Sequence, residues 1–393
     1  MLISLMSAKK NNQGFETRAI HAGQEPDPTT GAIMTPIYTS STYVQESPGV
    51  HKGYDYSRSV NPTRKALEAC IADLEGSTHG YAFASGMAAS ATVLELLTSG
   101  DHVIAMDDLY GGTYRLFENV RKRSAGLEFT FCDLSDLKTL EDSITEKTKM
   151  IWIETPTNPL LKIADLEAIS SFAKKHNLIS VCDNTFCSPF VQNPLEFGFD
   201  IVVHSATKYL NGHSDLIGGV VVCSEEKKEL AEEILYLQNA VGSIMNPFDS
   251  FLLLRSLKTL PVRMERHCSN AQQIASYLDS HSSIEKVIYP GLENHPQHHI
   301  AKKQMRGFGG MITVILKGGL ESATHFLERT ELFSLAESLG GVESLIEHPA
   351  IMTHASIPAE VREEIGISDG LVRLSVGIES IEDLLEDIEN SLA

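Results

Sequence analysis

One lysine of the chain lies where an amine with a chemical task is expected. Lys208 belongs to the segment HSATKYLNGHSD (204–215), which separates the apolar runs 199–203 and 216–222. Small hydroxyl side chains, those of Ser205 and Thr207, stand beside it in a chain with only 32 basic against 52 acidic residues. A lysine in such a turn is either a surface residue or a functional amine that forms a Schiff base with an aldehyde.

Further motifs have polar residues directly after strand-like runs. Gly86 of SGMAAS opens a predicted helix, where backbone amides can face an anion. Tyr110 of YGGTY has a ring that can stack on a flat ligand. Asn158 of ETPTNP stands between two prolines, and Asp183 of CDNT follows an apolar strand, where a carboxylate is costly without a partner. The ordinary alternatives are a turn glycine, an aromatic covering a helix start and a helix-capping acid.

Together these motifs describe one ligand. Ser205, Thr207 and the Gly86 turn can hold a phosphate. Asp183 can pair with a protonated ring nitrogen, and Lys208 can hold an aldehyde. A flat molecule that carries a phosphate, a ring nitrogen and an aldehyde is pyridoxal 5′-phosphate (PLP). The sequence therefore predicts PLP as the cofactor.

Alternation of short apolar runs with helix-length segments predicts how these residues are positioned. An α/β domain with a largely parallel sheet is expected, and ligands bind such sheets at the carboxyl ends of their strands. We expect an extended N-terminal arm over 1–60, a PLP-binding domain over 61–250 and a smaller α+β domain over 251–393. Helices are predicted from Lys65 to Glu75, with Asn61 as the cap, and over a long region from Glu225 to about Arg266. The strand-like runs are 81–84, 102–105, 150–154, 178–182, 201–203, 216–222, 286–289, 310–316 and 371–376.

Composition excludes several classes of partner. A formal charge of −20 repels nucleic acid and anionic membrane surfaces. No apolar run approaches membrane-spanning length, and the opening MLISLMSAKKNN has the wrong order for a secretory signal. Six scattered cysteines without a CxxC pair indicate reduced thiols and a cytoplasmic location. The start of translation stays open between Met1 and Met6.

A metal site is a further hypothesis for the stretch HPQHH (295–299). The stretch has no acid or cysteine at a suitable spacing. A surface loop followed by a helix start is therefore expected, and no metal.

Eight motifs, in order along nearly the whole chain, resemble the γ-family of PLP enzymes of cysteine and methionine metabolism. They are YSRSVNPTR (56–64), ASGMAA (84–89), DDLYGGTY (107–114), ETPTNP (154–159), CDNTF (182–186), HSATKYLNGHSD (204–215), AESLGGVESLIEHPAIMTHA (336–355) and LVRLSVGIE (371–379). The likeness is greatest to cystathionine γ-synthases and γ-lyases. It implies the type I fold of PLP-dependent transferases (aspartate aminotransferase-like), with a mostly parallel seven-stranded sheet.

The resemblance implies roles around the cofactor. Lys208 would carry PLP and move protons, and Asp183 would keep the ring nitrogen protonated. Tyr110 would stack on the ring, and Asn158 would lie near its phenolic oxygen. The implied phosphate ligands are Gly86, Met87, Ser205 and Thr207 of one subunit, with Tyr56 and Arg58 of its neighbour in a homotetramer.

Substrate recognition is implied for five further residues. Arg373 would hold the α-carboxylate in a bidentate pair, and Ser338 would orient Lys208. Glu337 and Asp55 would face the distal ammonium of cystathionine. Arg115 is a candidate for the distal carboxylate.

The expected reaction is elimination or replacement at Cγ of cystathionine-type substrates, as in a cystathionine γ-lyase or γ-synthase. Cystathionine β-lyase activity is the alternative. Gly112 stands where methionine γ-lyases typically carry a cysteine, which argues against that activity. A non-enzymatic PLP-binding regulator is a third possibility, but Lys208, Asp183 and Arg373 are all present. The sequence leaves the substrate preference open.

Overall fold

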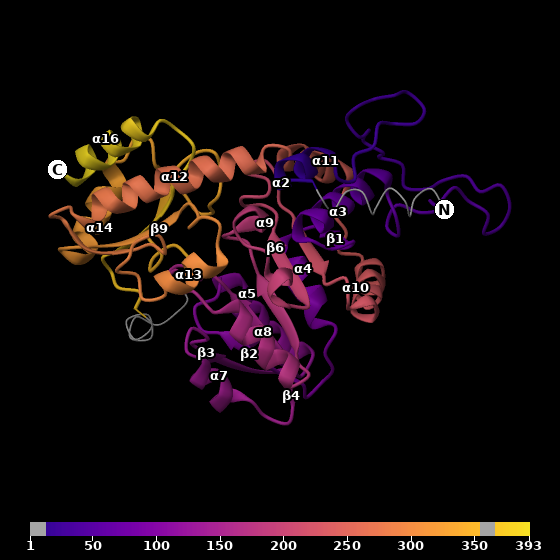
Figure 1. The fold of residues 1–393 in the computed structure, drawn as a ribbon, viewed down its shortest axis with the longest axis horizontal. Coiled ribbons are helices and arrows are strands. Elements are labelled where there is room, and N and C mark those ends of the chain that lie inside the picture. Colours follow the sequence, from indigo (N-terminus) through magenta and orange to yellow (C-terminus); the bar gives the residue numbers. More distant parts are fainter. Residues whose placement is uncertain (1–12, 354–365) are drawn as a thin grey trace.

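The computed structural model describes residues 13–353 and 366–393 and contains two sheets (Figure 1). The larger sheet has the strand order β1-β7-β6-β5-β4-β2-β3. All neighbours in it are parallel except β7, which runs antiparallel to both β1 and β6. The predicted α/β fold with a mostly parallel seven-stranded sheet is confirmed. Its strands are β1 (His79–Phe83), β2 (His102–Met106), β3 (Glu128–Cys132), β4 (Thr148–Glu154), β5 (Ile179–Asp183), β6 (Ile201–Ser205) and β7 (Gly219–Cys223).

Helices cover both faces of this sheet. One face packs in a core around Phe117 and Trp152, and the other packs against α3 and α11 through residues such as Leu67 and Leu254. The helices of this part are α2 (Phe15–His21), α3 (Pro62–Glu75), α4 (Gly86–Leu94), α5 (Gly111–Arg115), α6 (Lys122–Ser124), α7 (Leu137–Ser143), α8 (Leu166–Lys175), α9 (Ser188–Val191), α10 (Lys228–Val241) and α11 (Pro247–Leu257). A π-helical segment (Leu116–Arg121) joins α5 to α6, and a 3-10 turn (Pro194–Phe197) follows α9.

The helix predicted from Lys65 to Glu75 is confirmed with its cap. Asn61 Oδ1 accepts hydrogen bonds from the amides of Thr63 at 2.9 Å and Arg64 at 3.2 Å. Proline at the first helical position needs no hydrogen-bond acceptor, so Pro62 fits there. The Arg64 guanidinium donates to three carbonyl groups of the arm, those of residues 57, 58 and 59. These bonds attach the end of the arm to α3.

The long region predicted from Glu225 to about Arg266 is largely helical, but it is divided. Three helices occupy it, namely α10, α11 and α12 (Leu260–Asp279). Gly242 ends α10 with a left-handed φ of 82°, and prolines lie in the first turns of α11 and α12. Proline is tolerated there but breaks a helix interior, so each helix starts afresh. The arm also contains the short helix α2, which was not expected.

The smaller sheet has the order β10-β11-β12-β9-β8. Its strands are β8 (Ile284–Ile288), β9 (Met311–Leu316), β10 (Ser334–Leu335), β11 (Leu345–Glu347) and β12 (Leu371–Ser375), and β10 and β11 are too short to be recognised as apolar runs. The helices α12, α14 (Gly319–Arg329) and α16 (Ile381–Leu392) pack around it, and α13 (His298–Gln304) precedes β9. The long helix α12 runs between the two parts of the molecule (Figure 1). The two sheets occupy 79–223 and 284–375. These bounds do not fix where one domain ends and the next begins, so the domain limits near 60 and 250 stay predictions. None of the described helices is long and apolar enough to cross a membrane.

Candidate active site

One pocket gathers most of the predicted residues. It opens where β4, β5 and β6 end, and the smaller sheet closes it through β11 and β12. Parallel strands bring their carboxyl ends to the same edge of a sheet, as the sequence analysis expected. The predicted residues that line it are Gly86, Met87, Tyr110, Asn158, Asp183, Ser205, Thr207, Lys208, Glu337, Ser338 and Arg373.

Lys208 lies in the turn between β6 and β7, and its amine reaches the smaller domain. Lys208 Nζ donates to Ser338 Oγ at 2.6 Å. Ser338 adopts a φ of 85°, a left-handed conformation that is costly for a residue with a side chain. Burial, together with the nearby Arg373 guanidinium, lowers the pKa of Lys208 to about 8. A considerable fraction of the amine is therefore neutral near pH 7.5, as a nucleophile or base requires.

Two carboxyl groups line the pocket side by side, that of the buried Glu154 and that of the partly buried Asp183. Asp183 ends β5 and is paired in register with Glu154, which ends β4. Burial raises the pKa of both groups, and the charge of Asp183 raises that of Glu154 further. Asp183 Oδ1 accepts hydrogen bonds from the amide of Thr185 at 3.1 Å and from its hydroxyl at 2.5 Å. These bonds fix the orientation of a carboxylate that lines the pocket.

The start of α4 forms a small-residue cradle next to β6. A Cβ on Gly86 would lie 2.9 Å from the Cβ of Ser205, so only glycine fits there. The amides at the first turn of a helix have no intrahelical acceptors and attract anions. Ser85 Oγ accepts from the amide of Ala88 at 3.0 Å and caps the helix. The amide of Gly218 donates to Thr207 Oγ1 at 3.1 Å, which fixes that hydroxyl beside the cradle.

Two features position Tyr110, a hydrogen bond of its backbone amide and the absence of a side chain on Gly112. Its amide donates to Glu154 Oε2 at 3.0 Å. A Cβ on Gly112 would lie 2.4 Å from Tyr110 Cε1, so Gly112 gives the tyrosine ring its place. The ring lines the pocket and stays 41% exposed, which leaves a face for a flat ligand.

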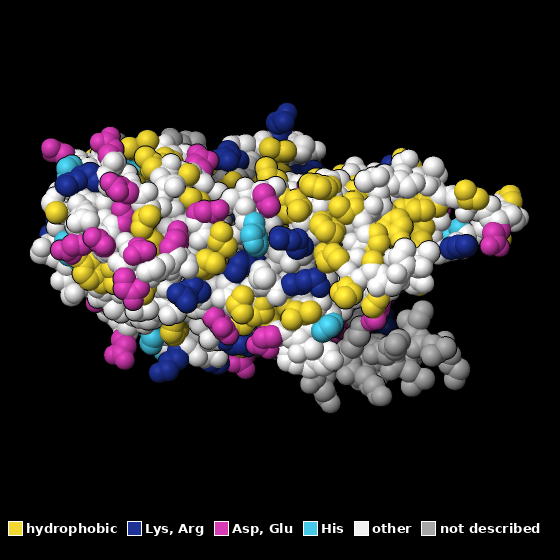
Figure 2. Space-filling model, turned by 90° about the horizontal axis from the view of Figure 1, so that it is seen from above, with side chains coloured by type: hydrophobic (Ala, Val, Ile, Leu, Met, Phe, Trp, Pro, Cys, Tyr) yellow, Lys and Arg dark blue, Asp and Glu magenta, His cyan; other side chains and the backbone are white. Residues whose placement is uncertain are grey.

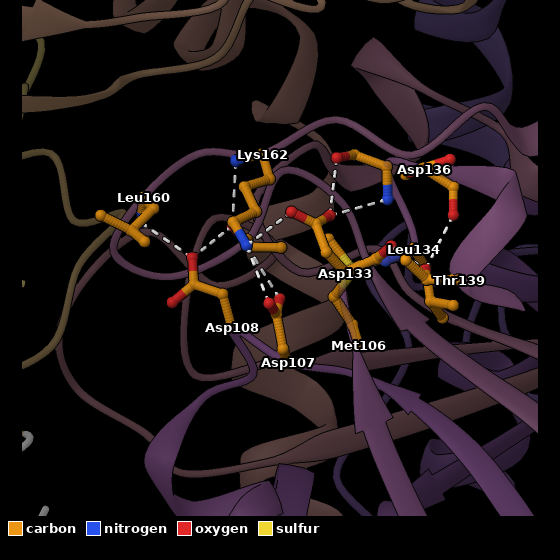
Figure 3. Close-up of polar contacts among 11 residues, drawn as sticks. Met106, Asp107, Asp108, Asp133, Leu134, Asp136, Thr139, Leu160 and Lys162 are labelled. Atoms are coloured by element: carbon orange, nitrogen blue, oxygen red, sulfur yellow. Dashed lines mark hydrogen bonds and ion pairs between the residues drawn. The ribbon is translucent and has the colours of Figure 1, made fainter. Parts of the chain in front are cut away.

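A lysine-centred cluster ties together the loops that carry Tyr110 and Asn158 (Figure 3). Lys162 Nζ donates to Asp107 Oδ2 at 2.9 Å and to Asp133 Oδ2 at 2.9 Å. Asp108 Oδ2 accepts from the amide of Leu160 at 3.0 Å. Burial raises the pKa of Asp108 to about 6. The strand ends of β2, β3 and β4 are thereby fixed relative to one another.

Arg373 is buried and contacts three protein groups through its Nη atoms. Its Nη1 donates to Asn158 Oδ1 at 2.7 Å and lies 2.9 Å from Glu347 Oε1. Its Nη2 donates to the carbonyl of Ser338 at 2.8 Å. Glu347 was not predicted as a site residue, although it lies in the motif 336–355, because an acid in a mixed segment has no distinguishing pattern.

Comparison with known proteins agrees with this geometry. A family model described as "Cys/Met metabolism PLP-dependent enzyme" matches residues 16–393. The chain belongs to this family. It is 64% identical to a protein named cystathionine beta-lyase from Coxiella burnetii, over 98% of this chain and 100% of that protein. It is 54% identical to a cystathionine gamma-lyase from Dictyostelium discoideum, over 97% of this chain and 98% of that one.

A solved structure has the same fold. The cystathionine gamma-lyase from Lactobacillus plantarum, complexed with L-serine, has a TM-score of 0.93 at 51% identity and covers 96% of this chain and 98% of its own. The predicted family and PLP cofactor are confirmed. The relatives carry both lyase names, so the Cγ and Cβ readings are both compatible with the comparisons.

The pocket fits PLP, the cofactor of this family. The Gly86 cradle has the space and the free amides that a phosphate needs. Asp183 would supply a partly buried carboxylate for a protonated ring nitrogen, and Lys208 would supply an amine for the aldehyde. No group of three His, Cys, Asp or Glu side chains suited to a metal occurs within 13–353 and 366–393.

Four predicted site residues lie outside this pocket. Asp55, Tyr56 and Arg58 are exposed on the arm, and the Arg58 guanidinium lies 5.7 Å from the centroid of the Tyr56 ring. Arg115 is exposed at the end of α5. The structure therefore does not bring them to the site of their own chain.

The surface loop expected at 295–299 is partly wrong. The helix start is present at His298, but His295 is buried and its Nε2 lies 3.1 Å from the carbonyl of Leu161. Burial lowers the pKa of His295 to about 4, so it is a neutral structural residue.

Proposed function

We propose that the protein uses PLP to cleave or replace the Cγ–S bond of cystathionine-type amino acids. The single observation that carries the proposal is the partly buried Lys208 amine, which has a pKa of about 8, donates to Ser338 at 2.6 Å and lines the same pocket as Asp183 and Arg373. As a lyase the protein would convert cystathionine and water to cysteine, 2-oxobutanoate and ammonia.

Each side chain of the pocket has a separate task in this reaction. PLP, when bound, supplies an electron sink for negative charge at the substrate α-carbon. Arg373 holds the α-carboxylate and thereby directs the α-hydrogen toward Lys208. Lys208 Nζ takes the α-proton and must pass it on before it takes a second proton from Cβ. Loss of the β-proton lets the γ-substituent leave, and the second proton is then available to the departing sulfur. Ser338 Oγ accepts the hydrogen bond of the amine and keeps it near both carbons.

The distal end of the substrate would meet acidic groups. Glu337 lines the same pocket and is close enough to Lys208 and Glu347 to affect the pKa of both. We assign it to the distal ammonium, with Asp55 contributed by a neighbouring subunit. Arg115 would hold the distal carboxylate. The β-lyase alternative, with homocysteine, pyruvate and ammonia as products, is supported by the name of the 64% identical relative.

The test is to incubate the purified PLP-loaded protein with L-cystathionine and identify the products. Cysteine with 2-oxobutanoate supports the proposal, and homocysteine with pyruvate supports the β-lyase alternative. If neither pair forms, O-acylated homoserine with cysteine is supplied, and cystathionine as product identifies a synthase. No turnover of any of these substrates would favour a non-enzymatic PLP-binding regulator.

We further propose a homotetramer in which the arm of one subunit completes the site of its neighbour. The arm exposes large apolar side chains, with Ile33 84% and Val44 93% exposed, and Figure 2 shows hydrophobic side chains gathered on the half of the molecule that carries it. Tyr56 and Arg58 would reach the neighbour's PLP phosphate. The six unpaired cysteines support a reducing compartment, the cytoplasm.

Complementation tests this sharing. Arg58→Ala and Lys208→Ala variants, each nearly inactive alone, are mixed under conditions that exchange subunits, which mass analysis of differently tagged chains verifies. With equal amounts of the two variants, half of the dimers are mixed, and each mixed dimer has one intact site of two. About a quarter of the wild-type activity is therefore expected. Exchange without recovered activity would contradict the shared site.

A further inference from the structure

Glu347 is a buried acid in the pocket that the reaction outlined above does not use. It ends β11 and is 1% exposed. It is directly opposite Arg373 in the antiparallel register of β11 and β12. Directly opposed side chains of antiparallel strands lie on the same face and in contact. The sheet itself therefore fixes this acid beside the arginine.

The guanidinium of Arg373 divides its donors between two edges. A guanidinium carries five N–H groups. Nη1 donates to Asn158 Oδ1 and forms an ion pair with Glu347 Oε1 at 2.9 Å, and Nη2 donates to the carbonyl of Ser338. Nε has no hydrogen-bond partner within 13–353 and 366–393. The edge formed by Nε and Nη2 therefore keeps the Nε–H donor without a protein acceptor, and the two nitrogens of this edge have the spacing that a carboxylate matches.

We propose that Glu347 is a positioning residue that holds Arg373 by its Nη1 corner and so reserves the Nε/Nη2 edge for the carboxylate of the amino-acid substrate. The proposal rests on the proposed role of Arg373 in binding that carboxylate. A guanidinium so deeply buried is costly without a compensating charge, and its flat fork binds a carboxylate well only in one orientation. The Glu347 carboxylate supplies the compensating charge. It also fixes the orientation of the guanidinium, because its Oε1 holds Nη1, the nitrogen that is not part of the Nε/Nη2 edge.

A purely electrostatic role of Glu347 would have the opposite effect on binding of the substrate carboxylate. If Glu347 acted only through its charge, it would repel the incoming carboxylate and weaken binding. The geometry favours positioning, since the Glu347 oxygen lies at Nη1 and leaves the substrate edge open. Length should then matter more than charge at this position.

Calorimetric titration of the PLP-loaded protein separates the two. The ligands are L-alanine and ethylamine, which differ only by the carboxylate, so the ratio of their affinities measures carboxylate recognition. Glu347→Gln keeps the reach of the side chain and should leave the ratio within about 3-fold of wild type. Glu347→Asp keeps the charge but is one methylene shorter, and Glu347→Leu loses both groups. Each should reduce the ratio by about 10- to 100-fold, as misplaced binding groups do.

The Arg373→Leu background shows whether Glu347 acts through Arg373. In that background Glu347→Asp should change the ratio no further. Tighter L-alanine binding in Glu347→Leu, wild-type behaviour of Glu347→Asp with loss in Glu347→Gln, or an unchanged effect in the Arg373→Leu background would each overturn the proposal. The Gln and Asp variants keep a polar group and do not depend on the Leu variant folding. A failure to cleave cystathionine would refute the proposed function but leave these titrations readable.

Discussion

Replacement of Lys208 by alanine is expected to lower turnover of cystathionine by roughly 10³-fold or more. In the proposed mechanism the substitution removes both the amine that binds the cofactor aldehyde and the base that moves the substrate protons. In the wild type, kcat should rise with pH around the Lys208 pKa of about 8, because the neutral amine is the active form and predominates above that pH. The variant should lose this rising limb and the visible absorbance of lysine-bound cofactor. Steady-state rates from pH 6 to 9.5 and an absorbance spectrum are the measurements.

Two companion variants separate the amine from its surroundings. Lys208→Arg retains a positive charge but never supplies a neutral amine, so it should be as inactive as the alanine variant. Ser338→Ala keeps the lysine and loses only the 2.6 Å hydrogen bond, so a loss of about 10-fold is expected. Added methylamine should restore part of the activity of Lys208→Ala. If Lys208→Ala kept the rising pH limb and more than a tenth of the wild-type rate, another residue would be the base.

The site was predictable where chain order alone brings residues together. Gly86, Asp183 and Ser205 each stand at or just after the end of a predicted strand, and a parallel sheet aligns these ends whatever the order of its strands. The apolar runs predicted six of the seven strands of the large sheet. They missed β3, a strand at the sheet edge whose side chains are only partly buried. A half-buried strand leaves a weak apolar pattern.

The rest depends on contacts between distant parts of the chain. Glu347 meets Arg373 only because β11 pairs with β12, and β11 has just three residues. Likewise Glu75 and His204 are both fully buried and lie 2.5 Å apart across 129 positions. In the sequence, Glu347 and Glu75 look like ordinary acids of a loop or a helix end. Tertiary packing determines which partners these acids contact, so no local sequence pattern could have identified them as site or core residues.

Asparagine in place of Asp183 is expected to separate activity from stability. The amide cannot keep a ring nitrogen protonated, so turnover should fall by about 10²- to 10³-fold, the effect of removing one partner of a buried charge pair. The same change should stabilise the cofactor-free protein at high pH. Burial raises the folded-state pKa of Asp183, so its contribution favours folding at low pH and is lost as the pH rises through that raised pKa. The amide of the Asp183→Asn variant would remain neutral, and its oxygen would still accept the hydrogen bonds that Thr185 donates to Oδ1.

Melting temperatures of the PLP-free wild type and of Asp183→Asn, taken from pH 5 to 9, measure the second effect. The two curves should agree best at low pH and separate at high pH, with the variant above. Glu154→Gln is the matched control, because it also removes one carboxylate of the buried pair. It should share the gain in cofactor-free stability at high pH, yet cost much less turnover, since it leaves in place Asp183, the proposed partner of the ring nitrogen. Equal turnover losses in the two variants would mean that the pair acts as a unit, and the assignment of Asp183 alone to the ring nitrogen would be wrong.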